Sequence, residues 1–299
     1  MTTTIPLPVQ DPRPWRRSLA GVSGRLGGAL AVLPLIVVGI YVLVAIVGPM
    51  LIAYDPVATN LAERLRPPGS VLADGSTAIL GTDGTGRDVF AQVVYGARTS
   101  MIIGAATVVI CAAFGMLVGL AAGYWGGAVD IVLSRVIDVL IAFPGIVLAI
   151  VVAGLFERGL LVVIVALSLS GWVSFARLTR ASTLSIKERD WVAAARVMGV
   201  STISIQARHI APFLVAPVAA LLALEFGLIV LGEAGLSFLG IGLPPSTVSW
   251  GQTIAAGKEY LSTAWWISAF PGMALALLVI MVGLLGDQLN SRYQRGGAR

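Results

Sequence analysis

The chain has 299 residues, of which 57% are hydrophobic and only 12% are charged, and its mean hydropathy is +0.92. This composition leaves too little charge to cover the surface of a water-soluble protein, so it excludes a soluble globular fold and indicates a chain embedded in lipid. The net charge of +5 does not indicate nucleic-acid binding, because the basic residues flank apolar segments and do not line one face.

Six apolar segments are expected to cross the membrane, since a spanning helix needs about 20 residues with few charges. The first, 29–54, is too long for a signal-peptide core and is expected to remain as an anchor. Residues 234–257 are also apolar, but glycines and prolines interrupt them, so they are expected to form a loop or re-entrant segment. The other five spans are expected at 99–123, 131–156, 159–176, 212–232 and 263–286.

The distribution of lysine and arginine predicts that both termini are cytoplasmic. With the N-terminus inside, fourteen of the twenty basic residues lie on the cytoplasmic side, as the positive-inside rule requires. The expected parts are a cytoplasmic tail (1–28), a first helix (29–54), an extracytoplasmic loop (55–98), a five-helix core (99–286) with a cytoplasmic loop (182–212), and a second cytoplasmic tail (287–299).

Glycines recur every four residues in the second span, at Gly115, Gly119 and Gly123, and the pattern continues to Gly127. This spacing places the glycines on one helical face, where another helix can approach closely. Glycine is also frequent in membrane helices generally. Three successive steps favour the packing interpretation.

The cytoplasmic loop is expected to form two short amphipathic helices separated by a break. Gly199 is expected to end the first helix in a left-handed conformation, Ser201 or Thr202 to cap the second, and Pro212 to mark the start of the fifth span. The apolar faces would cover either a cytoplasmic protein or lipid headgroups. The predicted apolar stripes are Trp191, Ala194, Ala195 and Met198, then Ile203, Ala207 and Ile210.

This loop resembles the EAA loop of ABC importer permeases. Ala194, Ala195, Gly199 and Pro212 stand at matching positions, whereas Ala193 stands where that pattern has Glu. This departure removes a carboxylate that helps to fix the loop in the family, and Glu188 and Asp190 lie nearby but do not match the position. His209 takes one of the last hydrophobic positions and is expected to cap a backbone carbonyl.

Further motifs are similar to those of the second permease chain in the dipeptide, oligopeptide and nickel branch of that family. They are LGTDGTGRD from Leu80, YGARTS from Tyr95, GYWGG from Gly123, DVLIAFP from Asp138, GLSFLGIGLPP from Gly235, SWG from Ser249, TAWW from Thr263 and GD from Gly286. The resemblance implies an all-α membrane protein with a type I importer permease core and an additional N-terminal helix. It also implies a multi-pass subunit in the cytoplasmic membrane of a bacterium.

The function implied is passage of peptides or similar small solutes, with nickel, glutathione and haem as other cargoes of such chains. The implied partners are a second permease subunit, two cytoplasmic ATPase subunits that bind ATP and Mg, an extracytoplasmic solute-binding protein and membrane lipid. No cofactor is expected in this chain. The residues expected to couple ATP hydrolysis to transport are Asp190, Ala194, Ala195, Arg196, Gly199, His209 and Pro212.

Three acidic residues within or near the spans are candidates for the translocation path: Asp138, Glu225 and Glu233. Glu225 lies mid-span and either borders a hydrated path or hydrogen-bonds a neighbouring helix. For Glu233, which matches the family's Glu before LSFLG, a role in holding the following loop is the stronger alternative.

Enzymatic and metal chemistry are not expected. The segment Gly81–Asp88 resembles a phosphate loop but lacks its Lys and Ser/Thr, and no nucleophile stands with a base at membrane depth. A single His209 and a single Cys111 are too few for a nitrogen and sulfur metal site. The alternative function is a proton-coupled secondary transporter, which would use a buried carboxylate but would be expected to show an internal repeat and to need no helical cytoplasmic loop.

Overall fold

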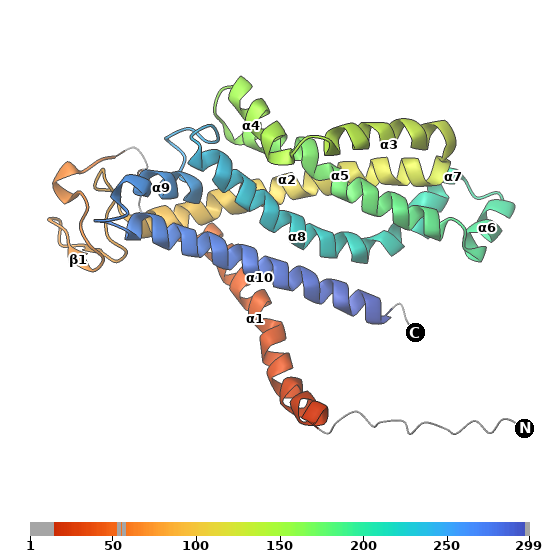
Figure 1. Cartoon of the computed structure of the whole chain (residues 1–299), viewed down its shortest axis with the longest axis horizontal. Helices are drawn as coiled ribbons and strands as arrows, with labels where there is room; N and C mark the ends of the chain where they lie inside the picture. The colour runs from red at the N-terminus through yellow and green to blue at the C-terminus, as the bar shows by residue number, and fades with distance from the viewer. Residues whose placement is uncertain (1–14, 53–54, 56–57, 297–299) are drawn as a thin grey trace, which may run out of the picture.

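The computed structural model describes residues 15–52, 55 and 58–296. These residues form an elongated bundle of helices with irregular segments at its two ends (Figure 1). We call residues 58–88 together with 239–265 the hairpin end, and residues 187–210 the α6 end. The hairpin end contains the two-stranded antiparallel sheet of β1 (Ser70–Val71) and β2 (Thr77–Ala78), the short helix α9 (Trp250–Gly257), and the single turns η1 (Leu61–Glu63) and η3 (Lys258–Tyr260).

Within the described residues, five helices are long and apolar enough to cross a membrane, and a bent pair makes a sixth when counted as one span. The expected all-helical membrane architecture is confirmed. The five are α1 (Trp15–Leu51), α2 (Val89–Trp125), α5 (Leu160–Ile186), α8 (Ala211–Phe238) and α10 (Trp266–Gly296); the pair is α3 (Gly127–Ile141) and α4 (Gly145–Leu155).

The third span is not the continuous helix expected over 131–156. Its two halves, α3 and α4, meet at an angle of 82°. Pro144 lies at the break in an extended conformation, with ψ of 123°. Proline has no N–H to donate and disfavours a helical conformation in the residue before it, so the helix stops and restarts there.

The other helices extend beyond the predicted spans. Helix α2 begins at Val89 rather than 99, α5 continues past 176 to Ile186, and α8 continues past 232 to Phe238. Residues 234–238, expected to be loop, are therefore helical. A search for charge-free segments finds the part of a helix that suits lipid, whereas the helix itself continues into the polar region.

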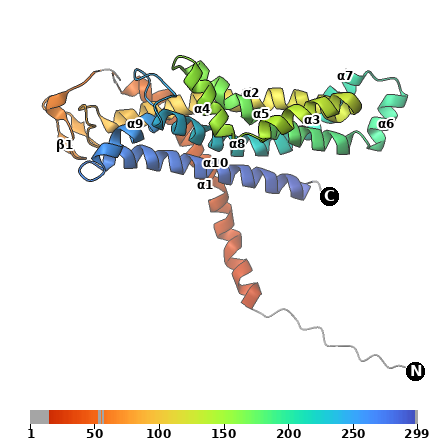
Figure 2. The same cartoon turned by 45° about the horizontal axis from the view of Figure 1, so that its top comes forward.

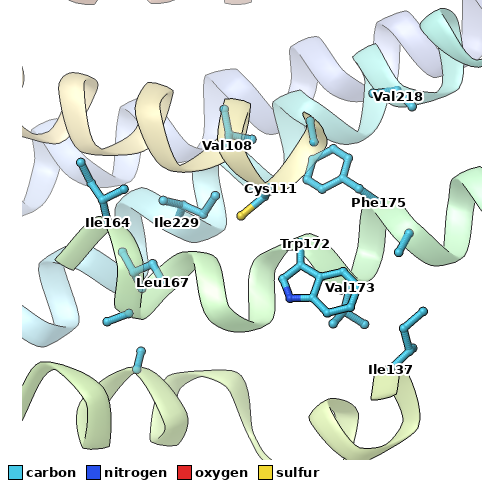
Figure 3. Close-up of a cluster of buried hydrophobic side chains, with 14 of the residues drawn as sticks. Val108, Cys111, Ile137, Ile164, Leu167, Trp172, Val173, Phe175, Val218 and Ile229 are labelled. Atoms are coloured by element: carbon cyan, nitrogen blue, oxygen red, sulfur yellow. The ribbon is translucent and has the colours of Figure 1, made fainter. Parts of the chain in front are cut away.

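The expected glycine stripe forms the contact between α2 and α5. A Cβ atom at Gly119 would lie 2.5 Å from the Ala176 carbonyl oxygen and 2.6 Å from Thr179 Cβ, and Gly115 and Gly123 are similarly close to α5. The prediction fails for Gly127, which has open space around it and a φ of +52°. Beside the stripe lies the main apolar core, to which α2, α5 and α8 contribute (Figure 3).

Helix α1 differs from the others because most of it stands clear of the bundle (Figures 1 and 2). Its C-terminal part lies against α2, where the single Tyr95 O–H is shared between the carbonyls of Ile52, at 3.0 Å, and Pro49, at 3.3 Å. Only 11% of the residues in the apolar 18-residue stretch of α1 are buried. Side chains of α1, α2, α8 and α10 line an apolar groove of about 880 Å³.

Candidate functional site

The α6 end has the helix, break and helix that the sequence predicts. Helix α6 (Asp190–Val197) ends at Gly199, whose φ is +78°. The N–H groups of Gly199 and Val200 donate to the carbonyls of Arg196 and Ala195, the paired bonds of a Schellman motif. Ser201 then caps α7 (Thr202–Ser204) by accepting a hydrogen bond from the Ser204 N–H.

The apolar residues of this region divide between two faces. Val192, Ala195, Ile205 and Ile210 are fully buried in the core of the bundle. Other large apolar side chains are exposed, by 89% for Val197, 75% for Met198 and 77% for Ile203, and Trp191 is 43% exposed and packs against Phe213 of α8.

The predicted stripes therefore mix two faces: Ala195 and Ile210 are buried, whereas Met198 and Ile203 are exposed. Residue spacing shows that a helix is amphipathic, but a helix of eight residues is too short to fix which side faces the core.

A wide π turn, η2 (Ile205–Ile210), connects α7 to α8, with the Ala211 N–H bonded to the Gln206 carbonyl. Pro212 follows directly, and in a regular α-helix its ring would clash with the carbonyl four residues earlier, so a wider turn relieves the clash. Gln206 Nε2 and His209 Nδ1 are buried without a hydrogen-bond partner in the described part of the chain. The expected bond from His209 to a carbonyl is thus not made by Nδ1.

Contacts with α2 hold both α6 and the end of α5. The Arg196 guanidinium lies 5.9 Å from the centre of the Tyr124 ring, and Lys187 Nζ donates to the Gly123 carbonyl over 2.9 Å. Asp190 is exposed in the first turn of α6, where a helix favours negative charge. Ala193, at the position of the family's Glu, is exposed, so its side chain makes no buried contact.

Glu233 is fully buried near the hairpin end. Its carboxylate accepts hydrogen bonds from Ser237 Oγ at 2.8 Å and Ser100 Oγ at 3.1 Å, and Ser249 is a third hydroxyl partner. Ser249 is also the N-cap of α9. The carboxylate thereby joins α2, α8 and α9, and none of its surface is exposed in this conformation.

The other two acidic candidates have different surroundings. Glu225 is half-buried on α8, with Ser174 of α5 as a hydrogen-bond partner. Asp138 is exposed on α3 and lines a cavity between α3 and α5. The three carboxylates therefore lie in three separate environments and do not form one cluster.

Two charged residues on α3 and α5 escaped the sequence analysis. Arg180 donates to both carboxylate oxygens of Asp130, from Nε over 2.5 Å and from Nη2 over 2.7 Å. Both residues lie at the ends of apolar segments, where sequence alone does not distinguish a flanking charge from a partner in an ion pair. Among the described residues, no three His, Cys, Asp or Glu side chains are grouped to hold a metal ion.

The sequence of this chain matches one protein family over residues 115–295, and that family is described as the binding-protein-dependent transport system inner membrane component. The chain belongs to this family. The permease is 41% identical over 256 residues to a putative peptide transport system permease protein of Brucella suis, covering 86% of this chain and 84% of the relative. It is 33% identical over 277 residues to the dipeptide transport system permease protein DppC of Alkalihalophilus pseudofirmus, covering 93% and 88%.

Among solved structures, an inward-facing MetNI methionine ABC transporter matches with a TM-score of 0.56 and 18% identity, over 68% of this chain and 97% of that chain. This match shows a shared type I importer permease fold. The expected function, a transmembrane permease subunit of an ABC importer, is confirmed by the family and the relatives. The names of those relatives describe transport system permease proteins.

Proposed function

We propose that this permease carries peptides or similar small solutes inward, with ATP hydrolysed in separate partner chains. The names of its relatives support this class of cargo, since they describe a peptide and a dipeptide transport system. The ATP and Mg would be bound by two ATPase subunits, and an extracytoplasmic binding protein would deliver the solute.

The observation that carries the proposal is the exposed apolar surface of the α6 end. Val197, Met198 and Ile203 lie around the Gly199 turn and are each at least three-quarters exposed. Three large apolar side chains beside one turn favour a protein partner over water. The contacts of Arg196 and Lys187 with α2 would carry movement of that partner into the bundle.

Replacing Met198 and Ile203 together by Asp tests this docking. We expect the double variant to insert normally but to lose co-purification of the ATPase chains and transport, because charge in an apolar contact is costly to desolvate. Leu61→Asp, at a position 70% exposed at the hairpin end, is the matched control and should keep both. Normal ATPase recovery with the double variant would contradict the proposal.

The proposed orientation places the α6 end in the cytoplasm and the hairpin end outside. Six basic residues between 177 and 208 at or near the α6 end support it. Labelling of single cysteines from each side of the membrane would test this orientation. A cysteine at Gly86, in the hairpin end, is unsuitable, because the φ there is +79° and a side chain would collide with Asn60. Cysteines at the exposed positions Val71 and Val197, in a Cys111→Ala background, should instead react from the outside and the inside, respectively.

A second permease subunit is proposed to cover α1 and the apolar groove beside it. The small buried share of α1 supports this, because a partner helix could fill the groove with apolar contacts. Disulfide capture of the second chain by a cysteine at Leu43, exposed on α1, would test the contact.

Glu225 and Asp138 remain our candidates for the translocation path, whereas the three hydroxyl contacts of Glu233 support a role in joining helices. If Glu225 borders the path, Glu225→Gln should slow uptake of cationic cargo more than neutral cargo, at equal amounts of complex. Equal uptake of both cargo types by the variant and wild type would leave Glu225 a structural role.

A further inference from the structure

A cavity of about 730 Å³ lies between α3 and α5. Its volume is within the range of sites for small solutes, roughly 300–1,000 Å³. Its polar lining comes from Ser134 and Asp138 on α3 and from Arg177 and Arg180 on α5. Ile137, also on α3, points toward Trp172 and Val173 of α5 and helps to close the cavity on the side of the core (Figure 3).

One of the two cations in the cavity is already neutralised. Arg180 makes a bidentate bond to Asp130, and Ser134 Oγ donates to the same carboxylate over 3.2 Å. This paired geometry holds the guanidinium in place, so Arg180 lines the cavity in a fixed position. It does not supply a free charge to a solute.

Asp138 and Arg177 are different: both are exposed, and neither makes an ion pair within the described residues. Both side chains line the same cavity, and Asp138 also lies within electrostatic range of Arg180.

We propose that this cavity binds a zwitterionic solute, with its ammonium group on Asp138 and its carboxylate on Arg177. The cavity presents one charge of each sign that has no ion-pair partner among the described residues, and a short free peptide carries the two complementary charges. A simple cation would meet Arg177, and a simple anion would meet Asp138. The inference rests on the proposed function and assigns the solute two contacts inside the permease.

The test measures binding of radiolabelled dialanine to the purified complex of permeases and ATPases, without the solute-binding protein. N-acetyl-dialanine and dialanine amide, each lacking one charge, are the competitors. Wild type should prefer dialanine to either by about tenfold, the factor that corresponds to 1.4 kcal/mol. Asp138→Asn should lose the preference over the acetylated form only, and Arg177→Gln the preference over the amide only.

Arg135→Gln is the control, because Arg135 is exposed on α3 and does not line the cavity. Should either neutral variant fail to assemble, Asp138→Glu and Arg177→Lys keep the charge and should keep the preference. The inference is overturned if wild type does not bind dialanine, if both variants retain both preferences, or if each variant loses binding of all three compounds alike. Failure of wild type to import dialanine in the complete system would instead contradict the proposed function.

Discussion

The two ends of the bundle differ in how completely they satisfy their own side chains. At the hairpin end, the buried Asp83 accepts hydrogen bonds from Thr85, Arg87 and Gln92, and the buried Trp250 and Trp266 rings donate to backbone carbonyls. The α6 end exposes large apolar side chains and buries the unpartnered Gln206 Nε2 and His209 Nδ1 atoms. Both ends expose large apolar side chains, but of the two, among the described residues, only the α6 end leaves buried polar side-chain atoms without a partner.

This comparison predicts that damage to the buried polar groups at or beside the hairpin end lowers stability, and Glu233→Leu, beside that end, should have the largest effect. Leucine would leave the hydroxyls of Ser100, Ser237 and Ser249 without their shared acceptor, and we expect the free energy of unfolding to fall by about 2–4 kcal/mol. Thermal unfolding of the purified permease measures it. Glu157→Leu, at an exposed position, is the control, and equal unfolding temperatures for the two variants would show that the hydroxyl contacts of Glu233 do not stabilise the fold.

At the α6 end, in contrast, a substitution should damage coupling more than stability. Gly199→Val places a β-branched residue at φ of +78°, at a local cost of about 1–2 kcal/mol. The turn should reorient, so that ATP hydrolysis is no longer stimulated by loaded binding protein while assembly persists. Gly154→Val, in open space on α4, should retain stimulation. Full stimulation in the Gly199 variant would show that the turn does not position the partner.

The smallest expected effect is a pH response confined to the hairpin end. Burial opposes ionisation of Asp83, but hydrogen bonds from Arg87 and Thr85 and the Arg87 charge outweigh it and hold the pKa of this carboxyl below its usual range. A lowered pKa means that the ionised group stabilises the fold above its unfolded pKa, and that this contribution disappears as pH falls through the folded value.

Hydrogen exchange of residues 80–92 should therefore accelerate below about pH 4, after correction for the intrinsic pH dependence of exchange. Asp83→Asn should already exchange faster at neutral pH and should lose this additional acid response. An unchanged acid response in the variant would assign it to another carboxyl group.

Local backbone features were predictable from sequence, because each depends on residues close together in the chain. Gly199 and Ser201 form the predicted turn, and the glycines of α2 form the predicted helix contact. Long-range partners were not predictable: Asp130 and Arg180 are 50 positions apart, and no periodicity connects them. Pro144 can be seen in the sequence, but hydropathy does not show the direction in which a helix continues. The 82° angle between α3 and α4 is therefore known only from the structure.

The glycine contact between α2 and α5 has a mechanical consequence. The backbone of α2 lies directly against carbonyls and side chains of α5, because the glycines add no side chain of their own, and we expect the two helices to move together. Helix α5, about 40 Å long, leads directly into the α6 end. We expect a tilt of α5 imposed at the α6 end to be transmitted to α2. We expect the far ends of both helices to be displaced in the opposite direction.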